Sequence, residues 1–137
     1  MKKNTVLTTL LLWSLLVLVS CGKDSVGDPT PPPPDEEALK ISTNASSLNV
    51  TAGAQFDFTV TVGSKMPANG VKIEYTVRGE SDNVVYPQGP AIETKTASTS
   101  ISISGLPRQK FVVTNITVTS LSKPSNTAST SFRVVYK

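Results

Sequence analysis

The chain has 137 residues with a formal net charge of +3, and it contains no histidine and a single cysteine. These counts exclude Ser-His-Asp and Cys-His nucleophilic sites, the usual zinc sites and an internal disulfide. Basic residues lie singly along the chain and form no run, so we expect no nucleic-acid partner.

The first 20 residues have the layout of a secretory signal. Lys2 and Lys3 precede an apolar run from Val6 to Val19, and a polar, proline-rich stretch follows. The run has roughly 14 residues, whereas a membrane-spanning helix needs about 20. We therefore expect residues 1–20 to be a signal peptide that is removed.

A cysteine follows the apolar run directly. The sequence Leu18-Val19-Ser20-Cys21 resembles the lipobox of bacterial lipoproteins, with an aliphatic residue three positions before the cysteine and a small residue next to it. The resemblance implies that the signal peptidase recognises Leu18, Val19 and Ser20. It also implies that Cys21 receives a diacylglyceryl group as a thioether and an N-acyl chain such as palmitate, because only a thiol can accept that group. The alternative is an ordinary free thiol.

Lipidation would make the membrane the first partner of the mature chain. One acyl chain binds a bilayer only marginally, while two or three anchor a protein firmly. Apart from this covalent lipid, the sequence predicts no cofactor and no metal.

Residues 21–38 read as a tether. Pro29 and Pro31 to Pro34 favour polyproline II geometry, and the acidic residues Asp35, Glu36 and Glu37 follow them. The segment has almost no apolar residues to bury, so we expect a disordered spacer. A proline-rich ligand for a partner domain is the alternative.

Short patterns in the tether concern location. Lys23-Asp24 partly resembles the charged export signal of surface lipoproteins in the Bacteroidota. Asp24-Ser25-Val26 resembles the O-glycosylation motif of the same phylum, with Ser25 as the acceptor. By the enterobacterial sorting rule, Gly22 would not retain the protein at the inner membrane. These resemblances imply the outer membrane and leave open its periplasmic or surface face.

Residues 39–137 alternate apolar and polar side chains with period two, which is typical of half-buried strands. Turn signals separate the alternating segments, and no segment has helical periodicity. About seven antiparallel strands in this length predict an all-β, two-sheet sandwich. The expected strands cover residues 48–50, 56–62, 71–77, 84–86 or 92, 101–103, 112–118 and 132–136.

A loop near the end of this domain carries a family resemblance. Gly105-Leu106-Pro107, followed by Phe111 and alternating valines, resembles the loop before the penultimate strand of fibronectin type III domains. The whole segment resembles bacterial immunoglobulin-like modules, which implies their sandwich fold. It lacks the cysteine pair and buried tryptophan of antibody domains, because Trp13 belongs to the signal.

Catalysis would have to come from a pair of carboxylates. The candidates are Asp57, Glu74, Glu80, Asp82 and Glu93. Asp57 and Glu74 are expected on solvent faces of different strands, whereas Glu80 and Asp82 share one loop. With Asn83, these loop residues favour a turn over a calcium site. We therefore expect a protein that is not an enzyme, with a carboxylate-dependent hydrolase as the remote alternative.

Two classes of function remain. The sequence favours a structural or protein-interaction module in the cell envelope, and a module that binds a polysaccharide or other ligand is the alternative. Tyr86 either contacts such a ligand or caps the core, and Arg108 and Lys110 could meet an acidic ligand. A concave aromatic surface around Tyr86 would favour ligand binding, and a bare apolar strand edge would favour partner pairing.

Overall fold

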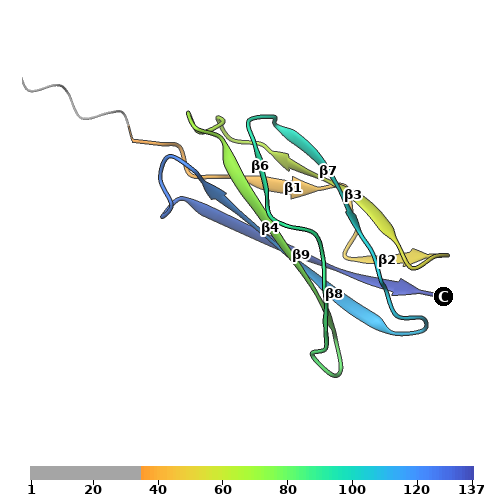
Figure 1. The fold of residues 1–137 in the computed structure, drawn as a ribbon. Coiled ribbons are helices and arrows are strands. Elements are labelled where there is room, and N and C mark those ends of the chain that lie inside the picture. Colours follow the sequence, from red (N-terminus) through yellow and green to blue (C-terminus); the bar gives the residue numbers. More distant parts are fainter. Residues whose placement is uncertain (1–34) are drawn as a thin grey trace, which may run out of the picture. The chain divides into compact units, whose positions relative to one another are not determined.

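The computed structural model describes residues 35–137, which form two β-sheets and no helix (Figure 1). No helix that could span a bilayer occurs within this range. The predicted all-β, two-sheet architecture is confirmed. The expectations for residues 1–34 lie outside the described residues.

The described part of the chain holds nine strands, two more than expected. The additional strands arise because residues 41–43 form a strand, and because residues 85–86 and 92–94 form separate strands. The strands are β1 (Ile41–Thr43), β2 (Leu48–Thr51), β3 (Phe56–Val62), β4 (Val71–Gly79), β5 (Val85–Tyr86), β6 (Ile92–Thr94), β7 (Ser98–Ile103), β8 (Phe111–Ser120) and β9 (Thr127–Tyr136).

The strands divide into a three-stranded and a six-stranded sheet. The smaller sheet has the order β1-β3-β7, and the larger has the order β2-β9-β8-β4-β5, with β6 also paired to β4. All strand pairs are antiparallel except β2 and β9, which run parallel. Our expectation that all the strands would be antiparallel was therefore wrong for this pair. The parallel pairing arises because the chain leaves β1 in one sheet and continues as β2 in the other.

The core lies between the inner faces of the two sheets. In β8 the residues at even positions, from Val112 to Ser120, are buried, and their odd-numbered neighbours face outward. The ring of Phe58 from the smaller sheet packs nearly edge to face against the ring of Phe132 from the larger sheet, with 4.9 Å between the ring centroids. Burial of each large aliphatic or aromatic side chain contributes about 1.5–3 kcal/mol to the free energy of folding. The apolar residues predicted from the alternation therefore drive the two sheets to pack together.

The acidic residues before β1 pack against the end of β8. The hydroxyl of Ser120 donates to the carboxylate of Glu36 at 2.7 Å, and Lys123 Nζ lies 2.7 Å from Asp35 Oδ1. Glu37 accepts a hydrogen bond from the Lys65 backbone N–H at 2.9 Å. Residues 35–38 therefore belong with the sandwich, although we expected the disordered spacer to reach residue 38. Each of the three carboxylates accepts a hydrogen bond from a group on the sandwich. The composition of the tether alone could not predict these contacts.

Candidate functional site

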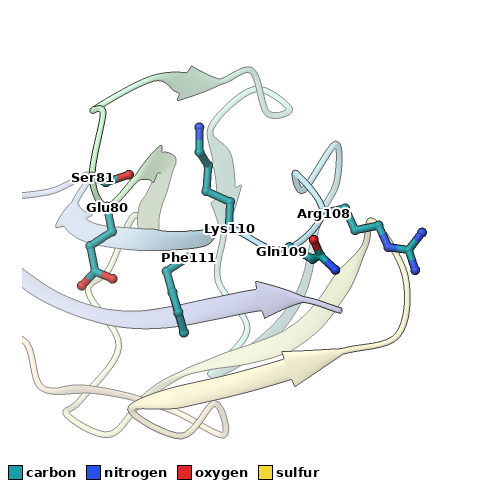
Figure 2. Close-up of a pocket in the computed structure, with 6 residues that line it drawn as sticks. All are labelled: Glu80, Ser81, Arg108, Gln109, Lys110 and Phe111. Atoms are coloured by element: carbon teal, nitrogen blue, oxygen red, sulfur yellow. The ribbon is translucent and has the colours of Figure 1, made fainter.

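A surface hollow at one end of the six-stranded sheet brings together Arg108 and Lys110 (Figure 2). Its volume is about 480 Å³. The turn after β4 forms one side, and the segment leading into β8 forms the other. The lining residues are Glu80, Ser81, Arg108, Gln109, Lys110 and Phe111.

The turn after β4 has the local chemistry expected of its sequence. Asp82 Oδ1 accepts the Val84 N–H at 3.2 Å, and the Asn83 N–H donates to the Gly79 carbonyl at 3.0 Å. Asn83 has a φ of 54°, a conformation that Asn tolerates better than most residues. These bonds make residues 80–83 a turn, as predicted.

The segment before β8 is bent in the same way at Gln109. This residue also has a φ of 54°, and its N–H donates to the Tyr136 carbonyl at 2.6 Å. The bend places Arg108 beside the end of β9, where it forms an isolated bridge with Tyr136. Arg108 and Lys110 consequently leave the chain on either side of a fixed bend.

Ion pairs occupy both carboxylates near the hollow. Lys110 Nζ contacts Asp82, and this hydrogen bond is the main reason that the pKa of Asp82 lies below its ordinary value and that of Lys110 above. Glu80 Oε2 lies 2.6 Å from Arg133, whose guanidinium sits 5.0 Å from the centre of the Phe111 ring. Each carboxylate thus has its own cation, and the pair does not form a shared acid–base site.

The side chains around the hollow diverge. In Figure 2, Lys110 and Phe111 point in opposite directions, and Arg108 extends away from both. Pockets for small ligands instead aim a few polar groups at a common point. The hollow therefore supplies charged and apolar surface rather than an enclosed binding pocket.

Tyr86 is not one of the residues that line the hollow, but its hydroxyl lies near Lys110, whose pKa is raised chiefly by Asp82 and to a smaller extent by Tyr86. Tyr86 pairs with Val77 across β5 and β4, which places its half-buried side chain on the inner face, packed against the core. The structure therefore brings Arg108 and Lys110 together at the hollow, and Tyr86 packs its ring against the core while its hydroxyl lies near Lys110. Ligand contact by any of these residues stays a prediction.

The other candidate carboxylates are exposed and separate. Asp57 lies on the outer face of β3, where Gln55 donates to it at 3.0 Å, and Glu74 pairs with Lys72 at 3.2 Å on β4. Glu93 faces outward from β6. Across residues 35–137, no group of His, Cys, Asp or Glu side chains is arranged to hold a metal ion.

Sequence reasoning missed an exposed apolar surface on the outer face of the six-stranded sheet. We call it the apolar patch. The strand register places its members in two neighbouring rows. One row contains Val50, Val135 and Phe111, and the other contains Leu48, Val113 and Val85 with Arg133 and Arg78 between them. The exposed members include Val50 (56%), Val85 (50%), Leu48 (45%) and Phe111 (41%). Its residues are Leu48, Val50, Val85, Phe111, Val113 and Val135.

The other end of the same face is polar. Beyond Val113, the outward residues of β8 are Asn115, Thr117 and Thr119. Thr117 and Ser129 hydroxyls lie 3.2 Å apart across β8 and β9. The outer face is thus divided into the apolar patch and a hydroxyl-rich end.

A sequence signal for the patch did exist. Phe111-Val112-Val113 and Val134-Val135 are consecutive apolar residues, so one member of each pair of neighbours must point away from the core. The regular alternation of apolar and polar residues along the rest of each strand predicted only the residues on the inner face.

The residues that carry the lipoprotein prediction lie outside the described residues. They are Leu18, Val19, Ser20 and Cys21, together with the predicted glycosylation acceptor Ser25. Their roles stay predictions.

No protein-family model matches the chain, and no curated protein matches it either. Among solved structures, the chain is similar to the CARDB domain of the PF1109 protein from Pyrococcus furiosus, crystallised in complex with di-metal ions. The sequences are 13% identical, the TM-score is 0.41, and the match covers 75% of this chain and 99% of that chain.

Proposed function

We propose that this chain is a lipid-anchored protein of the bacterial cell envelope whose β-sandwich is a non-catalytic protein-interaction module. The anchor rests on Leu18-Val19-Ser20-Cys21, which follows an apolar run and contains the only cysteine of the chain. The outer membrane is the proposed location because of Gly22 and the Lys23-Asp24 pattern.

The interaction role is carried by one observation, the gathering of exposed apolar side chains at one end of the six-stranded sheet. Exposed apolar side chains that are gathered in one place, rather than scattered singly, mark interaction sites when the surface they form is large. Leu48 and Val50 also lie on β2, an edge strand of that sheet. An apolar strand edge is the feature that favours partner pairing over ligand binding.

The alternatives have less support. A hydrolase needs two carboxylates acting together, but Glu80 and Asp82 are each paired to a different basic residue. A polysaccharide-binding module would use aromatic stacking, but the ring of Tyr86 lies on the inner face, and the Arg133 guanidinium already lies over the exposed ring of Phe111. Tyr86, Arg108 and Lys110 remain the contacts to test for that alternative.

The anchor is tested by metabolic labelling with a fatty acid that carries a detectable tag. We expect label on the wild-type chain and none on Cys21→Ala, because the thioether cannot form without the thiol. Ser25→Ala is the matched control and should keep the label. Label on Cys21→Ala would overturn the lipid-anchor proposal.

The interaction role is tested by affinity purification of the full chain from mildly solubilised envelopes. We expect an envelope protein that is recovered reproducibly in fixed proportion. Recovery of free polysaccharide alone would favour the ligand-binding alternative and overturn the interaction role. Protease shaving of intact cells in parallel would establish which face of the membrane carries the domain.

A further inference from the structure

We infer that the apolar patch is the contact surface for an acidic, extended segment of a partner protein. This inference rests on the interaction role proposed above, and it adds the surface and the chemistry of the partner. It is argued from the continuity of the patch, its charges and the free edge of β2.

The patch is continuous from β2 to β8, and Arg78 of β4 separates this part from Val85 of β5. Val135 lies between Val50 of β2 and Phe111 of β8 in one row. Although Val135 faces outward, only 6% of it is exposed, because apolar neighbours flank it on both sides. With strands about 4.8 Å apart, the part from β2 to β8 spans roughly 10 Å, and the row reaches roughly 19 Å when Arg78 and Val85 are included. This surface is wide enough to seat a peptide segment.

An aromatic ring and an arginine occupy the middle of the patch. The Arg133 guanidinium lies over the Phe111 ring at 5.0 Å, and Glu80 fixes its other side at 2.6 Å. Aromatic residues and arginine are enriched at the centres of protein interfaces. Because Arg133 is already held in place, a partner would order few additional side chains.

The charge around the patch selects an acidic partner. Glu80 and Asp82 are neutralised by Arg133 and Lys110, whereas Arg78 and Arg108 have no ion pair within residues 35–137. Arg78 lies inside the patch, between Val113 and Val85. Since a second copy would bring its own unpaired arginines to the contact, like charges disfavour self-association through this face.

The edge of β2 explains why the partner segment should be extended. The Arg133 N–H donates to the Ser47 carbonyl and the Lys137 N–H to the Thr51 carbonyl, so odd-numbered residues of this stretch bond to β9. In a parallel pair, the alternate residues then direct their backbone groups to the free edge. Leu48 and Val50 can therefore pair with an added strand and also contact its side chains.

The patch lies at the end of the sheet opposite to the first described residue. Asp35, where the chain continues toward Cys21, pairs with Lys123 beyond the end of β8, whereas Phe111 begins β8. The length of β8 separates these positions by roughly 30 Å. The segment that leads to the proposed anchor thus joins the sheet at the end away from the patch.

The test is site-specific photo-cross-linking of the full chain in the cells that produce it. A photoreactive residue replaces Val85 at the rim of the patch or, as a matched control, Ser131 on the hydroxyl-rich end of the same face. We expect a discrete protein adduct from position 85 only. The cross-linked peptide should combine Asp or Glu with alternating apolar residues.

Charge variants make the test specific. Arg78→Glu should lower the adduct yield about tenfold, because it replaces attraction by repulsion. Lys72→Glu is the control, since Lys72 faces outward on the same strand at the polar end. Matching melting temperatures for both variants would exclude a folding effect.

Several results would overturn the inference. These are an adduct between two copies, an adduct with phospholipid, equal yields from positions 85 and 131, and no adduct at position 85 when affinity purification recovers a partner. Each leaves the proposed interaction role intact. Failure of the purification itself would count against the proposed function.

Discussion

The hydroxyl of Thr114 is buried and has no hydrogen-bond partner in the described part of the chain. Thr114 lies on the inner face of β8 and is 0% exposed. A buried hydroxyl in this state costs about 1–3 kcal/mol of desolvation. The sandwich therefore carries a polar defect in the middle of its core.

We expect Thr114→Val to stabilise the domain by about 1 kcal/mol, because valine keeps the branched shape and removes the unpaired oxygen. Denaturant unfolding measures the change in the free energy of unfolding. Thr117→Val is the control, since Thr117 faces outward beside Ser129, and its effect should stay within about 0.5 kcal/mol. A loss of stability in Thr114→Val would contradict this account.

Gly70, just before β4, is required by its backbone. Its φ is +89°, and a Cβ there would meet the backbone carbonyl of Thr94 in β6. We expect Gly70→Ala to lower the free energy of unfolding by about 2 kcal/mol or more, because the backbone strain and the collision add.

Two other glycines separate these causes. Gly105 has a φ of +68° with open space around it, whereas Gly53 has open space and no positive φ. Gly105→Ala should cost about 1 kcal/mol, and Gly53→Ala should be close to neutral. Equal effects at all three positions, measured by thermal unfolding, would show that neither cause operates.

At the scale of strands, the sequence predicted what depends on local alternation. The stretches 56–62 and 112–118 were placed correctly because each buries every second residue. β1 was missed because Ile41–Thr43 offers a single apolar residue. The parallel pairing of β2 with β9 was also missed, since it joins Leu48 to Arg133, and no local pattern encodes contacts between residues so far apart.

The candidate site was predicted only where it depends on residues close together in the sequence. Arg108 and Lys110 flank one bend, so their proximity follows from the chain itself. The inward placement of Tyr86 depends on its pairing with Val77, and the apolar patch depends on side chains from β2, β9, β8 and β5. A surface assembled from four strands appears only once the sheet order is known.

At the scale of the whole molecule, exposed ion pairs lie at both ends of the six-stranded sheet. Lys123 lowers the pKa of Asp35 through a hydrogen bond, and Lys110 does the same for Asp82. A carboxyl whose pKa is lowered by folding adds stability above its ordinary value of 3.8 and loses it as the pH falls through the lowered value.

We therefore expect the melting temperature to fall between about pH 5 and pH 2, and to fall less in the double variant Asp35→Asn, Asp82→Asn. Thermal unfolding across a pH series measures this difference. Glu93→Gln removes an exposed carboxylate that has no ion pair within residues 35–137, and it should follow the wild-type curve. An unchanged acid response in the double variant would refute the assignment.

The order of strands in the larger sheet has a consequence for the order of folding. β9 (Thr127–Tyr136) lies between β2 and β8, so the sheet cannot close until residues 127–136 are available. A chain threaded through a translocon from its amino terminus would leave β2 and β8 without their shared neighbour throughout that passage. If the chain is exported as proposed, this delay would leave the larger sheet incomplete until the last strand has crossed the membrane.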